Sequence, residues 1–301
     1  MMKFAGGAGY LNVDLLFTGL EHLPEEGKEI YSREFDTQIG GGVPATMINM
    51  ARLGIPVKLL TFLGRDFFSD FVRKELDRFP IDYENLYTGD QMPVTVTAAM
   101  VTETDRSFLS FRNKKTVTPQ IEEKIYQELK GARVVEMQED FLHAYQRLKR
   151  EGTVLVLDTG WSEELSVENY RPYLETADFY TPNRKEALKI TGTGNLKDAA
   201  EVLSSFFEQV IIKLDADGCM IKDRAGTRII PPLPGVLPVD ATGAGDAFLS
   251  GFLFGLYEDY PLDDCVLFGN ITGGTCVQSV GCLSSYVNRE ELLGIARKLK
   301  G

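Results

Sequence analysis

Residues 238–255 read PVDATGAGDAFLSGFLFG and specify a tight turn followed by a helix. Gly243, Ala244 and Gly245 carry little or no side chain, so the backbone there can bend sharply and approach a ligand closely. Apolar residues then recur at helical spacing, which is typical of a buried helix; they are Phe248, Leu249, Phe252, Leu253 and Leu256. The first N–H groups of such a helix have no partner within it and lie at the positive end of the helix dipole. The stretch therefore predicts a helix whose N-terminus binds an anion.

One carboxylate, Asp246, stands at the junction of this turn and helix. Aspartate is a favoured residue at helix N-caps, so one interpretation is that Asp246 caps the helix. The other interpretation is chemical: a carboxylate beside an anion site is unfavourable unless the reaction uses it, for example as a general base. These residues alone leave both interpretations open.

The sequence from Asp240 to Asp246, DATGAGD, resembles the D-T-x-G-A-G-D motif of the PfkB (ribokinase-like) carbohydrate kinases. The resemblance implies that Asp246 is the catalytic base and that the amides of Gly243, Ala244 and Gly245 form an anion hole. It also implies a kinase of the fructokinase or 2-keto-3-deoxygluconate kinase type, which uses ATP and Mg²⁺ to phosphorylate a sugar hydroxyl.

Two further stretches resemble the substrate side of the same family. Residues 9–14, GYLNVD, look like its G-x-x-N-x-D motif, and residues 40–46, GGGVPAT, look like its glycine-rich substrate loop. Asn12 and Asp14 are two apart on a predicted strand, so their side chains should face the same way. The resemblance implies substrate binding by a set of five residues: Asn12, Asp14, Gly41, Gly42 and Thr46. Many members have Asn where Thr46 stands, so this departure leaves the identity of the sugar open.

Arg112 ends the stretch RSFLSFR, where fructokinase-like and ketodeoxygluconate-kinase-like relatives carry an arginine that reaches the substrate. The alternative is an exposed strand arginine, which is the common state of this residue. Asp158 follows a predicted strand, at the edge where ligands gather in α/β sheets, and is a candidate wall of the site.

On the nucleotide side, Asn183-Arg-Lys-Glu186 resembles the family's N-x-x-E motif, which implies that Asn183 contacts the nucleotide and that Glu186 acts indirectly on Mg²⁺. By itself the pattern is that of a capping box at a helix start. The stretch from Lys213 through Asp215 to Gly218 stands where relatives have a nucleotide-binding loop, with Asp215 in place of the first glycine. A tight hairpin turn explains this stretch equally well.

The resemblance extends to two more features of the C-terminal third. Asn270 lies in the predicted helix that borders the adenine in relatives. The family's potassium sites use a loop near Gly281 together with the backbone around Asp240 and Thr242, which implies a K⁺ site here.

Composition fits a single enzyme domain. The chain has 301 residues, of which 44% are hydrophobic and 25% charged, enough for the core of one large α/β domain over residues 1–301. A formal charge of −12 argues against nucleic-acid binding, which needs clustered Lys and Arg. Residues 1–9 lack a signal-peptide pattern, no apolar run is long enough to cross a membrane, and the four cysteines form no metal motif. We therefore expect a cytoplasmic protein without a membrane partner.

Strand and helix patterns alternate along most of the chain and predict a three-layer α/β/α sandwich with a mostly parallel sheet. Predicted strands cover 57–62, 132–136, 154–158, 179–181 and 210–214, and predicted helices include 69–78, 140–150 and 198–207. Two segments, about 11–37 and 92–113, instead predict antiparallel pairs, the second turning at 103–106. In the family these segments form a small β lid over the substrate, often shared between two subunits, which implies a homodimer.

The function that we predict is ATP-dependent phosphorylation of a sugar hydroxyl, with sugar and ATP as the small-molecule partners. A nucleoside or inositol kinase of the same fold is the alternative, because Thr46 stands where many members of the family have Asn. A catalytically silent binding relative is a third hypothesis, since fold does not fix function. The intact Asp246 and glycine turn argue against it, because a binding module needs no base beside an anion hole.

Overall fold

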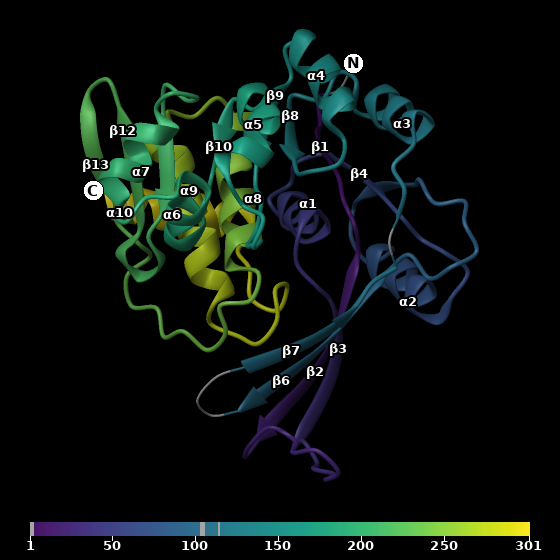
Figure 1. Cartoon of the computed structure of the whole chain (residues 1–301). Helices are drawn as coiled ribbons and strands as arrows, with labels where there is room; N and C mark the ends of the chain where they lie inside the picture. Colours follow the sequence, from purple (N-terminus) through teal and green to yellow (C-terminus); the bar gives the residue numbers. More distant parts are fainter. Residues whose placement is uncertain (1–2, 103–105, 114) are drawn as a thin grey trace.

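The computed structural model describes residues 3–102, 106–113 and 115–301, and it is built around a six-stranded sheet (Figure 1). The strand order is β10-β9-β8-β1-β4-β5, and all neighbouring pairs are parallel. The strands are β1 (Ala5–Ala8), β4 (Val57–Thr61), β5 (Asp82–Asn85), β8 (Val134–Met137), β9 (Val154–Leu157) and β10 (Phe179–Tyr180). The predicted parallel sheet is confirmed.

Neighbouring residues of the central strands belong to two different cores, so helices cover both faces of the sheet. Val134 of β8 packs in one cluster with α1 (Val43–Arg52), α8 (Ala244–Tyr257) and α9 (Leu262–Cys276). Val135 packs in the other cluster, which draws on α3 (Pro119–Leu129), α4 (Leu142–Arg150), α5 (Val167–Thr176), α6 (Arg184–Thr191) and α7 (Leu196–Leu203). The remaining helices are α2 (Phe67–Leu76) and α10 (Arg289–Lys300).

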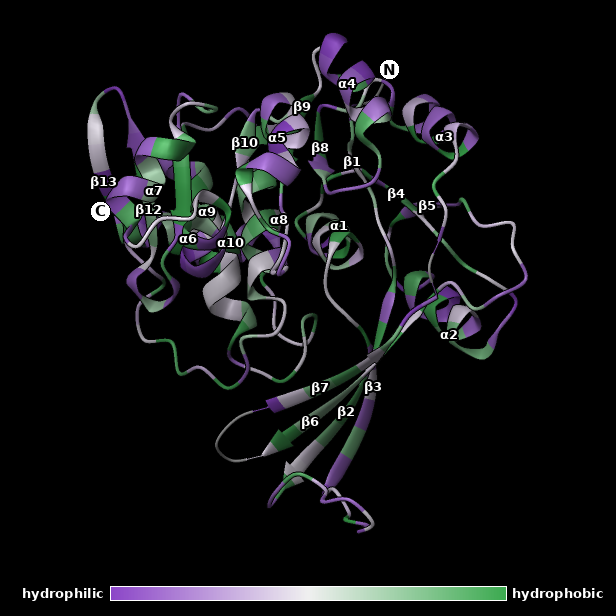
Figure 2. Ribbon diagram, viewed as in Figure 1, coloured by the Kyte–Doolittle hydropathy of each residue, from purple (hydrophilic) through white to green (hydrophobic). Residues whose placement is uncertain are grey.

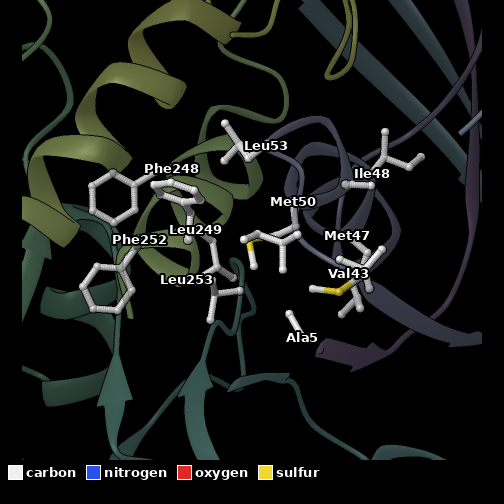
Figure 3. Close-up of a cluster of buried hydrophobic side chains, with 14 of the residues drawn as sticks. Ala5, Val43, Met47, Ile48, Met50, Leu53, Phe248, Leu249, Phe252 and Leu253 are labelled. Atoms are coloured by element: carbon white, nitrogen blue, oxygen red, sulfur yellow. The ribbon is translucent and has the colours of Figure 1, made fainter. Parts of the chain in front are cut away.

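The packing of α8 explains its small residues. Figure 3 shows Leu249 and Leu253 facing Met50 of α1 in the buried cluster. On another side of α8, a Cβ added at Gly251 would fall closer than 3.0 Å to the carbonyl oxygen of Phe268 in α9. Glycine therefore lets α8 and α9 approach closely, and the predicted buried helix is confirmed.

Two predictions about the sheet differ from the structure. The strand at β11 (Val210–Lys213) belongs to a separate antiparallel sheet with β12 (Cys219–Asp223) and β13 (Gly226–Ile230), and an isolated parallel bridge joins Lys213 to Asn183. Strand β1, of sequence AGGA, escaped prediction because glycine has low strand propensity. Gly7 is needed there, since an added Cβ would fall closer than 3.0 Å to Val43 of α1.

The predicted lid is a four-stranded sheet in the order β3-β2-β6-β7, which extends away from the layered body (Figure 1). Its strands are β2 (Asn12–Leu20), β3 (Glu34–Ile39), β6 (Thr95–Thr102) and β7 (Arg106–Phe111). Both predicted antiparallel pairs are confirmed, and β2 and β6 pair in parallel between them. Of the predicted turn, residues 103–105 lie outside the described residues. Figure 2 shows apolar residues along these strands, and Phe35, Phe108, Leu109 and Phe111 are exposed.

Within the described ranges, no helix combines the length and the apolar character that crossing a membrane requires.

Candidate active site

The glycine turn before α8 is held in a conformation that only glycine adopts readily. Gly243 is the N-cap residue with φ 74°, and a Cβ there would fall closer than 3.0 Å to Cys282. Asp246 is the third residue of the helix and makes no capping hydrogen bond. The interpretation of Asp246 as the helix cap is therefore wrong, because the left-handed glycine already takes that position.

The Asp246 carboxylate lies against the backbone of the glycine-rich loop before α1. The Gly42 amide donates a hydrogen bond to it, and a Cβ added at Gly41 would fall closer than 3.0 Å to its Oδ2 atom. Burial raises the pKa of Asp246 to about 6, and the nearby carboxylates of Asp158 and Asp14 add to the rise. A carboxylate with a pKa near neutrality, in the first turn of a helix, is suited to general base catalysis next to an anion.

Asn12 and Asp14 face the same side of β2, as predicted. The Asn12 side-chain amide donates to Asp14 Oδ1 at 2.6 Å, and the Thr97 hydroxyl donates to Asn12 Oδ1 at 3.1 Å. Gly40 lies so close that an added Cβ would contact both the Asn12 and Asp14 side chains within 3.0 Å. Burial raises the pKa of Asp14 to about 6, opposed by the Asn12 hydrogen bond and assisted by the charge of Asp240.

Arg106, at the start of β7, reaches from the lid to the turn before α8 and was not predicted as a site residue. It forms an ion pair with Asp240. Burial opposes ionisation of Asp240, but hydrogen bonds from Gly281 and Thr242 and the charge of Arg106 lower its pKa. Arg112, the predicted lid arginine, is exposed and lies beside Lys115 at the base of the lid.

Lys213 lies beside the glycine turn that we predict to form an anion hole. Its Nζ atom lies 3.3 Å from Asp158 Oδ1 and would be 3.4 Å from a Cβ at Gly245. Burial opposes its charge, but the carboxylates of Asp158 and Glu186 raise the pKa of Lys213. A positive charge is therefore held beside the amides at the start of α8, together with Asp158, the candidate wall residue.

Asn183 and Glu186 form the capping box that their spacing predicts. Asn183 Oδ1 accepts from the Glu186 amide at 3.0 Å, and Glu186 Oε2 accepts from the Asn183 amide at 2.8 Å. The Glu186 side chain is buried near Lys213 and Asp158, and burial raises its pKa. The motif therefore has a structural role at the start of α6 and also lies on the edge of the charged cluster.

The hairpin interpretation of the loop after β11 is confirmed. Asp215 has φ 56° in a short turn of 3-10 helix, and Gly218 joins it to β12. Asp215 and the next two residues are exposed.

Asn270 is buried in α9 and donates to the backbone carbonyls of Ile230 and Pro231 at 3.0 and 2.8 Å. The side-chain amide of Asn270 thus holds the chain after β13. Contact of Asp215, Gly218 or Asn270 with a nucleotide stays a prediction.

Thr46 is a predicted substrate-binding residue, and its contact with the substrate stays a prediction. Its side chain is fully buried in α1, and the hydroxyl donates to the Asp246 carbonyl at 3.4 Å. The side chain points into the protein because α1 packs directly against α8. Thr46 therefore supports the helix start from behind the site.

The side chains present fit Mg²⁺ that arrives with ATP. In the part of the chain that the structure describes, no group of three or more His, Cys, Asp or Glu side chains could hold a metal ion alone. Magnesium in kinases usually keeps several waters and binds one or two carboxylates plus the substrate phosphates. Asp158 and Glu186, beside Lys213, are two such carboxylates.

The predicted potassium site fits less well. The Cys276 thiol lies 3.6 Å from the carbonyl oxygen of Thr242 and 3.6 Å from that of Cys282, and it donates to both. The Asp240 carboxylate accepts hydrogen bonds from Thr242 and Gly281 and pairs with Arg106. Because these groups satisfy one another, the arrangement does not fit a potassium ion between those two carbonyls.

A layered α/β body, a lid, a helix start that we predict to bind an anion and a carboxylate of raised pKa are together typical of a phosphotransferase of the kinase class. The pfkB family carbohydrate kinase model matches residues 8–289, so the chain belongs to this family of ATP-dependent phosphotransferases.

Individual relatives include both sugar and nucleoside kinases. A ribokinase from Lactococcus lactis is 21% identical over 297 residues, covering 97% of this chain and 96% of the relative. A cytidine kinase from Thermococcus kodakarensis is 28% identical over 243 residues, covering 77% of this chain and 85% of the relative. The structure of Arabidopsis thaliana ribokinase complexed with ribose and ATP aligns over 99% of both chains with a TM-score of 0.80 and 21% identity, which establishes a shared fold.

Proposed function

We propose that this kinase transfers the γ-phosphoryl group of ATP to a hydroxyl group of a sugar, with Asp246 as the general base. The observation that carries the proposal is the position of Asp246: its pKa is raised to about 6, and it lies in the first turn of α8 beside the anion-binding amides. In this mechanism Asp246 accepts the hydroxyl proton as the oxygen attacks the γ-phosphorus. The bond from that phosphorus to the bridging oxygen breaks, and ADP leaves with the electron pair.

The groups around Asp246 divide the remaining work. The amides of Gly243, Ala244 and Gly245 and the charge of Lys213 stabilise the negative charge on the moving phosphoryl group. Magnesium neutralises charge on the ATP phosphates when it is bound, and Asp158 and Glu186 would hold it. Asn183, Asp215, Gly218 and Asn270 stay our predicted nucleotide contacts.

On the acceptor side, we propose that Asn12, Asp14, Gly41 and Gly42 bind the sugar next to Asp246. Two observations support this: the Asp14 carboxylate is held by Asn12, and the Gly41 backbone comes so close to Asp246 that an added Cβ would fall within 3.0 Å of its Oδ2 atom. Arg106 of the lid pairs with Asp240, whose charge acts on Asp14, and Arg112 stays a predicted acceptor contact. Closing the lid over the acceptor would exclude water that competes for the phosphoryl group.

A nucleoside acceptor is the second candidate. An inositol acceptor is a further alternative to a sugar. The nucleoside candidate is supported by the cytidine kinase relative and by Thr46, which is buried where many sugar kinases of the family present an asparagine. The acceptor is set by the shape and hydrogen bonds of the site, and a mismatched hydroxyl leaves a buried polar group unpaired.

The test of the function is ADP release from Mg-ATP with a panel of acceptors. The panel contains fructose, 2-keto-3-deoxygluconate, ribose, tagatose 6-phosphate, myo-inositol and nucleosides. Turnover with a sugar that disappears in Asp246→Asn supports the proposal, and turnover with nucleosides alone supports the second candidate. No turnover with any acceptor, despite measurable ATP binding, would favour a binding protein.

Asp14→Asn is expected to raise the acceptor KM at least about tenfold at pH 7.5, because a carboxylate that accepts hydroxyl hydrogen bonds contributes roughly 1.5–3 kcal/mol. Since the pKa of Asp14 is about 6, we also expect the wild-type acceptor KM to rise as the pH falls below that value. Steady-state kinetics from pH 5 to 8 tests both statements. An acceptor KM that is equal in the variant and the wild type would remove Asp14 from the binding site.

We also propose that the lid takes part in a homodimer. Exposed apolar residues on it, among them Phe35, Phe108 and Leu109, support this because an exposed apolar patch is unfavourable in water. Sedimentation of the wild type, compared with a Leu109→Glu variant, tests the proposal: a monomer in both would contradict it.

A further inference from the structure

Asp240 is a carboxylate at the junction of the lid and the layered body, and the mechanism above gives it no role. It lies in the turn before α8. Its Oδ1 atom accepts hydrogen bonds from the amide and the hydroxyl of Thr242 at 2.9 and 2.7 Å, and its Oδ2 atom accepts from the Gly281 amide at 2.9 Å. The carboxylate thus joins two segments of the body, the turn at 240–242 and the loop at 281–284.

The lid presents a guanidinium group to this carboxylate. Arg106, at the start of β7, forms an ion pair with Asp240 Oδ1, and its Cζ atom lies 5.6 Å from the centre of the Phe108 ring. Figure 1 shows this end of β7 below the loop that leads into α8. Hydrogen bonds between charged groups are stronger than those between neutral groups, so the pair fastens the lid where the body places its carboxylate.

The opposite edge of the lid contacts the same loop of the body. The Ser284 hydroxyl donates to Gln38 Oε1 of β3 at 3.4 Å, and the Cys282 thiol donates to the Ile39 carbonyl oxygen at 3.1 Å. A Cβ added at Gly281 would fall closer than 3.0 Å to Gln38 Oε1. Strands β3 and β7 are the two edge strands of the lid sheet. Both edges of the lid therefore meet the segments that the turn carboxylate joins.

Arg106 lies on the same face of the lid sheet as Asp14. Asp14 of β2 pairs with Thr97 of β6, and Thr97 pairs with Ser110 of β7. Paired residues share a face of a sheet, and residues two or four apart on one strand share it as well. Arg106 precedes Ser110 by four positions on β7. The ion pair is therefore made from the lid face that carries the proposed acceptor residues.

The charge of Asp240 also acts on the proposed acceptor site. It raises the pKa of Asp14, and the charge of Asp14 in turn adds to the rise in the pKa of Asp246. The other titratable side chains that face these carboxylates are the thiols of Cys276 and Cys282, which stay neutral because burial raises their pKa. The lid guanidinium is the positive charge that opposes the turn carboxylate, and it helps to lower the pKa of Asp240.

We propose that Arg106 is a positioning residue for phosphoryl transfer, which fastens the lid to the turn before α8 by pairing with Asp240 and neutralises that charge beside the acceptor site. The inference rests on the proposed function. Opening the lid would separate the two charges, so the ion pair favours the closed state by the free energy of their attraction. Closure then retains the acceptor beside Asp14 and Asp246.

Acceptor kinetics tests the proposal. Arg106→Gln should raise the acceptor KM about tenfold or more, the change typical of a lost hydrogen bond between charged groups. The KM for ATP should change less than about threefold, because the lid face that carries Arg106 carries the acceptor residues. An unchanged acceptor KM, or equal rises in both KM values, would overturn the inference.

Arg33→Gln is the matched control for Arg106→Gln. Arg33 precedes β3 and pairs with Glu21 at 3.4 Å, but the two side chains are 68% and 81% exposed, against 31% and 12% for Arg106 and Asp240. An exposed pair contributes little, so this variant should keep the wild-type acceptor KM. A loss as large as that of Arg106→Gln would show that any lid charge matters and would contradict the specific pair.

A double variant tests whether the two charges act together. Asp240→Asn removes the other half of the pair, and the double variant with Arg106→Gln should have an acceptor KM no higher than that of the worse single variant. Rises that multiply in the double variant would show independent roles and would overturn the pairing.

The pH dependence of the acceptor KM separates this role from simple support of the fold. In wild type we expect the KM to rise below the pKa of Asp14, about 6. Arg106→Gln leaves the charge of Asp240 unopposed, which raises the pKa of Asp14 and moves the midpoint to higher pH. Asp240→Asn removes that charge and moves the midpoint to lower pH. Midpoints that move in the same direction, or not at all, would overturn the inference.

Hydrogen exchange tests the pair without any substrate. The amides of Thr242 and Gly281 donate to Asp240, so their exchange reports how firmly its carboxylate is held. Both amides should exchange faster in Arg106→Gln than in wild type, and at the wild-type rate in Arg33→Gln. Equal rates in Arg106→Gln and wild type would overturn the inference. If wild type phosphorylates no acceptor, the proposed function fails, and the exchange rates still decide whether Arg106 holds the turn.

Discussion

Asp246→Asn is expected to lower kcat about 10²- to 10⁴-fold, the range for loss of a general base. The substitution keeps the size and shape of the side chain, so the Gly42 amide and the Gly41 backbone still contact it. Asparagine cannot accept the hydroxyl proton, and the acceptor oxygen must then attack while still protonated. Steady-state kinetics, with acceptor affinity measured by calorimetry, checks the expectation. A variant that turns over near the wild-type rate with acceptor properly bound would exclude Asp246 as the base.

The same residue should make activity and stability depend on pH in opposite directions. Wild-type kcat should rise with pH through about 6, because the base acts only when it is deprotonated. Stability should fall over the range from 3.8 to about 6, because the unfolded chain ionises Asp246 more readily than the folded one. Asp246→Asn avoids this loss. Its Tm should therefore exceed that of wild type at pH 7 and approach it near pH 4, which thermal unfolding across this range measures.

Gly41→Ala is expected to lower kcat at least about 10²-fold, because a displacement of about 1 Å in a reacting group costs that much. The added Cβ would fall closer than 3.0 Å to Asp246 Oδ2, so the carboxylate or the loop must move. The backbone of Gly41 does not adopt the left-handed conformation, so the effect comes from the contact rather than from local strain.

Gly194→Ala is the matched control for Gly41→Ala. It adds the same methyl group at a position with nothing within 4 Å, and it should leave kcat unchanged. Comparable Tm values for both variants would assign the loss to the site. If Gly41→Ala retains wild-type kcat, the close approach of the loop to Asp246 is not part of the active arrangement.

Local patterns in the sequence were sufficient for much of the framework. The turn and helix at 243–257 follow from small residues and apolar spacing, and the common orientation of Asn12 and Asp14 follows from the twofold period of a strand. The capping box at Asn183 follows from a spacing of three residues. Each of these features depends on neighbours in the chain, so a short stretch carries the information.

Other features escaped because distant segments create them. Arg106 meets Asp240 across 134 positions, and nothing near either residue indicates the partner. Thr46 lies in a motif associated with substrate, yet the packing of α1 against α8 turns its hydroxyl toward the Asp246 backbone. Strand β1 is held between two neighbours although its own residues have low strand propensity.

The family and the class of reaction are therefore readable from motifs, because chemistry requires particular residue types at short spacings, and the same motifs predict Asp246 as the catalytic base. The ionisation states of Asp246, Asp14 and Asp240 are a property of the folded molecule alone. The pKa of each carboxyl depends on how far folding removes it from water and on which charges folding brings beside it, and both quantities are set by residues far away in the chain.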